Sequence, residues 1–295
     1  MKITVKAYAK INLLLDILSK FENGYHNLFT VMQSVDLYDT VEAENNESGK
    51  ITIECETEGV PCDERNIAYK AAKSFFDYCN IDSGRGVHIK IIKGIPHAAG
   101  LAGGSADGAA VIKALCEIYK PNLRYTDKIK IAANVGADVP FCLFGGTCLC
   151  QNIGDVLSFL PPLPEVYIVL SKPVQAVATG GAYAAHDSIA DRVRHPDNFG
   201  MLHAVLDGDI DRISMLCNNV FEQSIEVYDR VYIKSVMRKN GAIASCMSGS
   251  GPTVFGIFKN KNDAEKACGA LKETIEQTYV CRPMNFGCEI IKTED

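Results

Sequence analysis

Residues 95–107 of this chain are Ile95-Pro96-His97-Ala98-Ala99-Gly100-Leu101-Ala102-Gly103-Gly104-Ser105-Ala106-Asp107. They form a glycine- and alanine-rich loop between a strand-like run at 87–92 and a helix-like run at 108–119. Small residues let the backbone turn tightly and bring its N–H groups close to a ligand. The first turn of the following helix adds unpaired N–H groups and the positive end of a helix dipole. This combination predicts a phosphate site, to which Ser105 adds a hydroxyl donor.

The same loop also suits a simple connection between a strand and a helix. Its spacing matches neither the P-loop G-x-x-x-x-G-K-[ST] nor the dinucleotide motif G-x-G-x-x-G. Asp107 stands immediately before the helix-like run, where its side chain is expected to cap the helix. Taken alone, the loop favours phosphate binding and leaves the plain turn open.

The composition indicates a globular protein and argues against nucleic acid as a partner. The chain has 295 residues, enough for two domains of ordinary size, with 47% hydrophobic and 22% charged residues. A net charge of −6 leaves no broad basic face for nucleic acid. Residues 1–6 lack the apolar core of a signal peptide, and no apolar run approaches the ~20 residues of a membrane span. We therefore expect a cytoplasmic protein without a membrane partner.

The twelve cysteines contain no C-x-x-C motif, and most stand inside apolar runs. Free cysteine packs as a small hydrophobic residue, and a reducing compartment keeps it unpaired. Cys148 and Cys150 have strand spacing and share a face, so a metal site there stays open. No third or fourth ligand lies close in sequence, however. We interpret the cysteines as core residues.

Strand and helix signals alternate in both halves, which predicts an α+β fold. Strands are expected at 2–18, 30–35, 40–44, 51–56, 87–92, 141–144, 166–170 and 279–291. Helices are expected at 66–78, 108–119, 126–135, 181–186, 199–206, 210–216, 226–239 and 263–275. The proline-rich run at 160–164 interrupts every periodic pattern, so we place a boundary there between domains 1–159 and 160–295.

Lys10 and Asn12 are polar residues inside an otherwise apolar strand. Because they are two residues apart, their side chains point to the same face. The common explanation is the solvated side of a half-exposed sheet; the alternative is a functional pair.

Two further polar positions lie at turns. Tyr25 and His26 follow an Asn-Gly turn signal and either decorate the surface or bind a planar ligand. Asp138 lies among small and apolar residues between two expected elements. Such an acid is often a helix cap, but a partly buried one needs a charged partner.

Three segments together resemble signatures of the GHMP small-molecule kinases. The glycine loop resembles the second signature, P-x-x-x-G-L-x-x-S-[SA], and residues 247–253 resemble the third. Residues 9–13 are similar to the first signature in one branch, whose acceptor is a cytidine-linked methylerythritol. Further marks of that branch are Asn23-Gly24-Tyr25-His26, Gly136-Ala137-Asp138-Val139-Pro140 and Glu64-Arg65-Asn66. The matches keep the family order from residue 6 to residue 256.

The resemblance implies a two-domain GHMP kinase fold. Residues 1–159 would form an ATP-binding domain like the second domain of ribosomal protein S5, and residues 160–295 a ferredoxin-like domain. The site would lie in the cleft between them. The implied reaction transfers the γ-phosphate of ATP to the 2-hydroxyl of the cytidine-linked acceptor, giving ADP, in the non-mevalonate route to isoprenoid precursors.

The resemblance also implies roles for single residues. Asp138 would accept the acceptor's proton, and Lys10 would keep Asp138 ionised. Asn12 would orient the acceptor. The cytosine ring would bind Tyr25 and His26, with Tyr183 on its other face.

The implied ATP-binding residues are the loop residues together with two that line the adenine pocket in relatives. They are Pro96, His97, Ala98, Ala99, Gly100, Leu101, Ala102, Gly103, Gly104, Ser105, Ala106, Asn66 and Lys93. Mg²⁺ should accompany ATP, and the sequence names no ligand for it.

Some positions depart from the family pattern. Tyr8 replaces a common proline, Ala102 and Ala106 replace a glycine and a serine, and residues 151–155 replace a glycine-containing turn. These changes bear on nucleotide affinity more than on the class of reaction.

Three rival functions remain. A mevalonate or homoserine kinase would have no base for Tyr25 and His26 to bind. A catalytically dead nucleotide-binding relative would not need Lys10 and Asp138. RNA binding is disfavoured by the negative charge.

Overall fold

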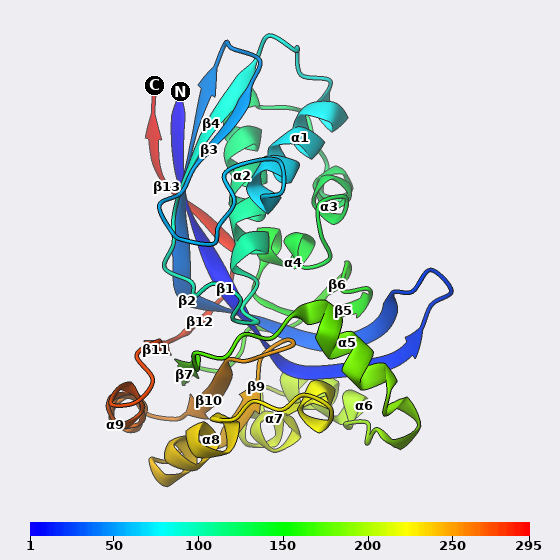
Figure 1. Ribbon diagram of the computed structural model, residues 1–295, viewed down its shortest axis with the longest axis vertical. Helices are drawn as coiled ribbons and strands as arrows, with labels where there is room; N and C mark the ends of the chain where they lie inside the picture. The colour runs from blue at the N-terminus through cyan, green and yellow to red at the C-terminus, as the bar shows by residue number, and fades with distance from the viewer.

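The computed structural model describes all 295 residues and contains two β-sheets with helices packed on them (Figure 1). The larger sheet has the order β13-β1-β2-β4-β3, from β1 (Lys2–Lys20), β2 (His26–Asn46), β3 (Ile51–Glu54), β4 (Gly86–Ile92) and β13 (Cys288–Glu294). Four short strands extend it. β5 (Thr147–Asn152) and β12 (Pro283–Met284) pair with β2, β6 (Val156–Phe159) pairs with β5, and β8 (Asn218–Asn219) pairs with β1. The smaller sheet has the order β11-β7-β10-β9, from β7 (Tyr167–Ser171), β9 (Ala244–Met247), β10 (Val254–Phe258) and β11 (Thr278–Cys281).

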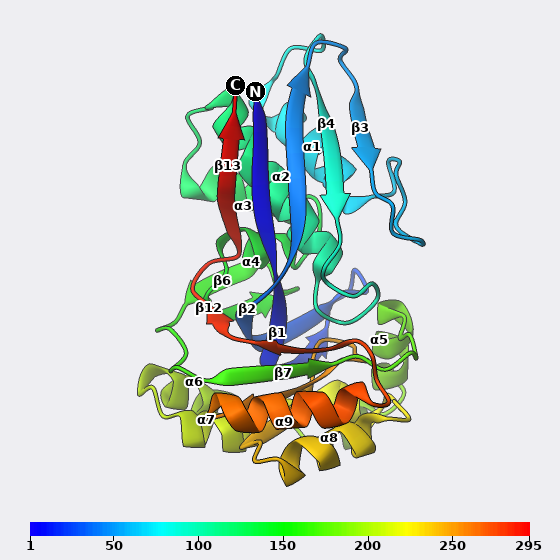
Figure 2. The ribbon, with the colours of Figure 1, turned by 90° about the vertical axis from the view of Figure 1, so that its left-hand side faces the viewer.

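Helices cover one face of the larger sheet and leave the other face open, as Figure 2 shows. The covering helices are α1 (Ile67–Cys79), α2 (Gly103–Tyr119), α3 (Tyr125–Ala133) and α4 (Val139–Phe144). The second half contains α5 (Thr179–Asp187), α6 (Asn198–Leu206), α7 (Ile210–Leu216), α8 (Arg230–Lys239) and α9 (Lys261–Lys272), with short 3₁₀ turns at Ala190–Arg192 and Val220–Gln223. Of these, α8 and α9 pack on the smaller sheet. None of the helices combines the length and the apolar character needed to cross a membrane.

The helix α2 lies at the centre of the first half because small side chains let it approach the sheet closely. Its buried positions include Ala106, Ala109, Ala110 and Ala114, all fully inaccessible to solvent. The main core cluster continues from α2 and the larger sheet to residues of the smaller sheet, such as Phe255. One continuous core therefore joins the two halves, and the α+β architecture is confirmed.

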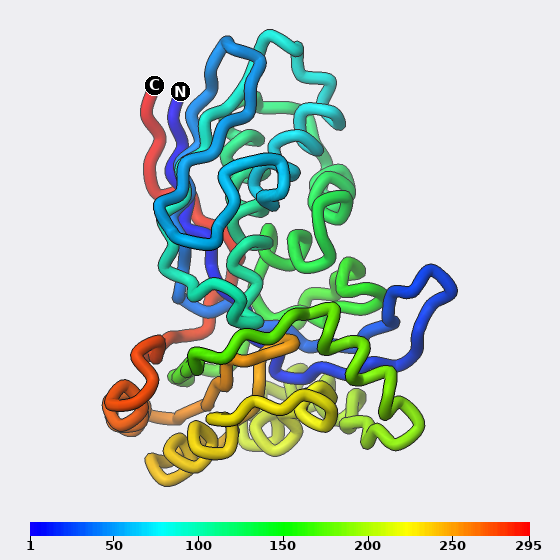
Figure 3. The backbone as a smooth tube through the Cα atoms, viewed as in Figure 1, coloured from blue at the N-terminus to red at the C-terminus, as the bar shows by residue number.

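The β1–β2 hairpin is longer than predicted and passes from one half of the molecule to the other (Figure 3). Its antiparallel register shifts at three places along β1, between Tyr8 and Ala9, between Asn12 and Leu14, and between Ile17 and Ser19. Such bulges bend a strand and increase its twist. They turn the hairpin so that Lys10 and Asn12 lie where the two halves meet.

The segment 141–144 is a helix, so the predicted strand there is wrong. The run is apolar on all sides and buried between α2 and the larger sheet, and periodicity cannot separate a short buried helix from a buried strand. Pro140 in the first helical turn is the local signal for the helix.

The helix α2 begins at Gly103, five residues before the predicted start. The second half of the glycine loop is therefore the first turn of the helix itself. Ala102, with φ 59°, occupies the cap position without a side-chain bond, and Asp107 is buried in the second turn. The prediction that Asp107 caps the helix is wrong.

The larger sheet takes strands from both ends of the chain. After β11 the chain leaves the smaller sheet, and β13 pairs antiparallel with β1, so the termini lie side by side (Figure 2). The division into residues 1–159 and 160–295 stays a prediction, and these last strands belong to the sheet of the first half.

The backbone of Gly287, just before β13, packs too closely against α4 for any residue with a side chain. A Cβ added there would overlap the carbonyl of Cys142, so Gly287→Ala should lower the free energy of unfolding by about 1–3 kcal/mol. Gly269 is the matched control, because a Cβ at this exposed position in α9 meets no atom within 4 Å. Gly269→Ala should raise stability by about 0.5–1 kcal/mol. Urea denaturation of both variants measures the difference, and equal effects would contradict the constraint.

Candidate active site

Two cavities meet between the two halves of the molecule. The first, about 450 Å³, is lined by the glycine loop, by Lys10 and Asn12 of β1 and by residues 249–250, and we call it the loop cavity. The second, about 580 Å³, is lined by residues 24–26 and by α5, and we call it the hairpin cavity. Both include Ser105 and Asp138, which therefore mark the point where the cavities join.

The glycine loop lines the first cavity with its backbone. Ala98, Gly100 and Ala102 have left-handed φ angles of 51°, 74° and 59°. The loop then enters α2, where the backbone N–H groups of Gly103, Gly104 and Ser105 bond to no acceptor in the protein. Three free donors at the positive end of a helix are the arrangement that binds phosphate groups.

The loop is held in place by the segment between β9 and β10. Ser248 Oγ donates to Gly100 O at 3.0 Å, and Thr253 N donates to Ala99 O at 3.3 Å. A Cβ on Gly100 would overlap the Ser248 carbonyl, so only glycine allows this approach.

Lys10 is buried, with 4% of the residue exposed, and its ammonium is held by Asn12. Lys10 Nζ donates to Asn12 Oδ1 at 2.8 Å, and Gly249 N donates to the same oxygen at 2.9 Å. Asn12 Nδ2 donates in turn to Thr30 Oγ1 at 2.8 Å. Asn12 therefore binds the lysine, the neighbouring strand and a loop of the second half.

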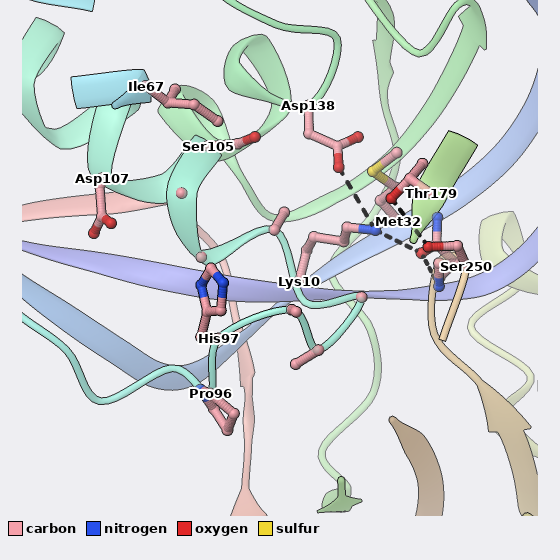
Figure 4. A pocket seen from close by; sticks show the side chains of 18 of the residues that line it. Lys10, Met32, Ile67, Pro96, His97, Ser105, Asp107, Asp138, Thr179 and Ser250 are labelled. Carbon is pink, nitrogen blue, oxygen red and sulfur yellow. Dashed lines mark hydrogen bonds and ion pairs between the residues drawn. The ribbon is translucent and has the colours of Figure 1, made fainter. Parts of the chain in front are cut away.

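Asp138 faces Lys10 across the cavity junction (Figure 4). Its Oδ2 lies 3.7 Å from Lys10 Nζ, and its side chain is 33% exposed. Asp138 occupies the cap position of α4 but makes no capping bond, so its carboxylate is available to a ligand. The predicted pair of Lys10 and Asp138 is brought together by the fold.

In the hairpin cavity, His26 and Tyr183 lie face to face. Their rings are stacked with centroids 4.5 Å apart and an interplanar angle of 19°. His26 Nε2 lies 2.7 Å from Asp187 Oδ1, and Lys20 donates to the other oxygen. The hydrogen bond from Lys20, and then that from His26, lowers the pKa of Asp187.

Tyr25 lines the same cavity from the surface, with 59% of the residue exposed. The predicted arrangement has a base between the side chains of residues 25–26 and Tyr183. The structure leaves no space for a ring between His26 and Tyr183, so a base would have to use the exposed Tyr25 side of the cavity.

Asn66 and Lys93 line the loop cavity as predicted, but their side chains are engaged within the protein. Asn66 caps α1 by accepting from Ala68 N at 2.8 Å and donates to Pro61 O at 2.6 Å. The Lys93 ammonium donates to Asp39 and to Asp107.

Sequence reasoning missed several residues that line the loop cavity, among them Thr179, Gly249 and Ser250. The Ser-Gly-Ser-Gly run at 248–251 was the available signal for the last two. All twelve cysteines are unpaired, and no group of three or more His, Cys, Asp or Glu side chains could hold a metal ion.

Comparison with known families gives a class that fits this geometry. Residues 66–146 match the family described as GHMP kinases N terminal domain, and residues 201–277 match GHMP kinases C terminal. The fold and the site thus define a small-molecule kinase of the GHMP class.

Individual proteins of known name indicate which kind of GHMP kinase this chain resembles. The chain is 42% identical to a 4-diphosphocytidyl-2-C-methyl-D-erythritol kinase of Caldicellulosiruptor bescii, over 96% of this chain and 99% of that protein. It is 41% identical to the protein of the same name from Clostridium acetobutylicum, over 94% and 99%. The chain belongs to the 4-diphosphocytidyl-2-C-methyl-D-erythritol kinase family.

Solved structures agree with this. A crystal structure of 4-(cytidine 5'-diphospho)-2C-methyl-D-erythritol kinase matches with a TM-score of 0.78 and 28% identity, over 96% of this chain and 99% of that one. Homoserine kinase from Cytophaga hutchinsonii also has a TM-score of 0.78, over 98% and 97%, at 19% identity, and it shares the fold alone.

Because Asn12 Oδ1 accepts two buried hydrogen bonds, we expect its loss to destabilise the protein. Asn12→Ala leaves the Lys10 ammonium and Gly249 N–H without their buried acceptor, which should lower the free energy of unfolding by about 1–3 kcal/mol. Asn218→Ala, at an exposed position on β8, should change it by no more than about 0.5 kcal/mol. Urea denaturation compares the two variants, and an Asn12 variant as stable as the control would contradict this role.

Proposed function

We propose that the protein phosphorylates the 2-hydroxyl of 4-diphosphocytidyl-2-C-methyl-D-erythritol with ATP, giving ADP, in the non-mevalonate isoprenoid pathway. The observation that carries the mechanism is the position of Asp138. It lies where a cavity with free helix N–H groups meets a cavity with aromatic walls, 3.7 Å from a buried lysine. Phosphoryl transfer needs a donor and an acceptor aligned at such a junction.

Asp138 would act as the general base. A carboxylate that makes no capping bond can accept the proton of an alcohol placed within hydrogen-bond distance. The Lys10 ammonium, 3.7 Å from Asp138 Oδ2, would stabilise the negative charge that develops on the attacking oxygen. Asn12 holds Lys10 and lines the loop cavity, and its second amide hydrogen has no acceptor in the protein, so it is available to orient the acceptor.

The ATP site would be the loop cavity. The triphosphate would bind residues 96–106, with the free N–H groups of Gly103, Gly104 and Ser105 directed at it. Asn66 and Lys93 would border the adenine, and their internal bonds would keep that wall rigid. In this proposal residues 1–159 form the ATP-binding domain, and residues 160–295 complete the site through the 248–251 loop.

Mg²⁺ would arrive with ATP as part of the substrate. The chain has no cluster of side chains that could hold the ion alone. Mg²⁺ is commonly bound by substrate phosphates together with one or two protein ligands. The Ser105 hydroxyl lies at the junction of both cavities and would be one ligand, which leaves Asp138 free for the proton (Figure 4).

The cytosine of the acceptor would bind in the hairpin cavity. Tyr25 offers an exposed ring, and the buried His26 and the half-buried Tyr183 form an aromatic wall beside it. Asp187 fixes the orientation of His26 through Nε2.

We also propose a cytoplasmic location and small molecules, not nucleic acid, as the partners. The twelve unpaired cysteines are consistent with a reducing compartment.

The assay that tests the function measures ADP release with three acceptors. The cytidine-linked methylerythritol should support turnover, whereas mevalonate and homoserine should not. Turnover with mevalonate or homoserine in its place would assign the protein to another GHMP reaction.

If Asp138 is the general base, replacing it should lower the catalytic rate and leave ATP binding unchanged. Asp138→Asn should lower kcat by about 10²–10⁴. Asp211→Asn, at an exposed position on α7 outside both cavities, is the control and should retain the wild-type rate. A near wild-type kcat for the Asp138 variant would remove this residue from the mechanism.

Removing the exposed ring of the hairpin cavity predicts weaker acceptor binding. Base–aromatic stacking is worth about 1–3 kcal/mol, so Tyr25→Ala should raise the KM of the acceptor by about 5- to 150-fold. The KM of ATP should stay unchanged, and Tyr228→Ala, at another exposed tyrosine, should alter neither. A rise in the KM of ATP alone would mean that the two pockets are exchanged.

A further inference from the structure

A cluster of three buried charged side chains lies beneath the glycine loop. Asp39 belongs to β2, Lys93 follows β4, and Asp107 is in the second turn of α2. Lys93 Nζ donates to Asp107 Oδ2 at 2.7 Å and also to Asp39 Oδ2. The three side chains are 0%, 8% and 3% exposed in that order. Burying charges is costly even when they are paired, so a gain in stability does not explain such a cluster. We therefore looked for a functional reason for its position.

The cluster holds the beginning of the glycine loop. Asp39 Oδ1 accepts hydrogen bonds from the backbone N–H groups of Gly94 and Ile95, each at 2.7 Å. The chain is therefore fixed to β2 at the point where it leaves β4 and enters the loop.

The cluster also holds the end of the loop. Asp107 belongs to α2, and Lys93 Nζ lies 3.3 Å from the position that a Cβ of Gly103 would occupy. The ammonium is thus in contact with the helical turn that carries the free N–H groups. Between the two ends the backbone passes through Ala98 and Ala102 in the left-handed region. Alanine keeps that conformation only where the surroundings enforce it.

We propose that Asp39, Lys93 and Asp107 form a clasp that joins both ends of the glycine loop and positions the first turn of α2 for the nucleotide phosphates. In this proposal Asp107 is a positioning residue for ATP affinity. The inference rests on the proposed function, because it assumes that ATP binds to this loop. Asp107 and Lys93 both line the loop cavity, so the clasp is next to the ligand that it would serve.

Asp107→Ala tests the clasp with little risk to folding. It leaves Lys93 and Asp39 as a balanced pair, and alanine favours a helix. Losing a charged hydrogen bond at this point should raise the KM and the calorimetric Kd of ATP about tenfold. The kcat and the KM of the acceptor should stay within about twofold, since the loop, and not the hairpin cavity, has lost its support.

A conservative variant and a structural control complete the series. Asp107→Asn keeps an oxygen that can accept the hydrogen bond from Lys93, so the link between Lys93 and the first turns of α2 is retained. This variant should restore ATP affinity to within about threefold of wild type. Asp127→Ala removes a helical aspartate that binds Tyr78 outside the cavity, so it should lower the melting temperature without changing the KM of ATP.

The outcomes separate the clasp from the proposed function. If Asp107→Ala lowers the melting temperature but binds ATP like wild type, the cluster is only structural and the inference is wrong. If wild type itself neither binds nor consumes ATP, the proposed function fails instead. Should Asp107→Ala not fold, Asp107→Leu fills the space of the carboxylate with an apolar side chain and leaves Lys93 paired with Asp39. The same tenfold loss of ATP affinity is then expected, and an unchanged affinity again overturns the clasp.

Discussion

One buried oxygen, Asn12 Oδ1, connects the parts of the molecule that have to act together. It accepts from the ammonium of Lys10 on the larger sheet and from the backbone of Gly249 in the loop of the smaller sheet. A buried oxygen shared by two donors cannot give up one of them without exposing an unpaired polar group. The position of the proposed catalytic cation is therefore tied to the position of the second half of the chain.

The close approach of two loops around this oxygen depends on backbone that only glycine permits. Gly249 has a φ of 55°, and a Cβ there would lie 2.9 Å from Gly100 O and 3.3 Å from Lys10 Nζ. Side chains at Gly100 and Gly249 would push the two loops apart and remove the close packing around Lys10. The glycines in this region thus determine how near the glycine loop comes to Lys10.

The sequence predicted those parts of the fold and site that local pattern determines. The helix at α1 and the strand β4 follow from periodicity, and the shared face of Lys10 and Asn12 follows from strand spacing. The start of α2 was missed because glycine and alanine carry no polarity pattern, so the helical turn at Gly103 looked like loop. Asp39 was missed for a different reason, since its partners Lys93 and Asp107 are 54 and 68 positions away and meet it only in the folded sheet. The stacking of His26 on Tyr183 is likewise a product of tertiary packing that no local signal contains.

The pairing of β13 with β1 has a consequence for how the protein is made. β1 is synthesised long before β13, yet the two strands are neighbours in one sheet. Until β13 has been made, residues 2–7 of β1 lack the partner strand that covers this edge of the sheet. Unpaired edges are where nascent chains associate wrongly. The larger sheet is therefore completed late, and a chain cut short before β13 would leave β1 at the margin of the sheet.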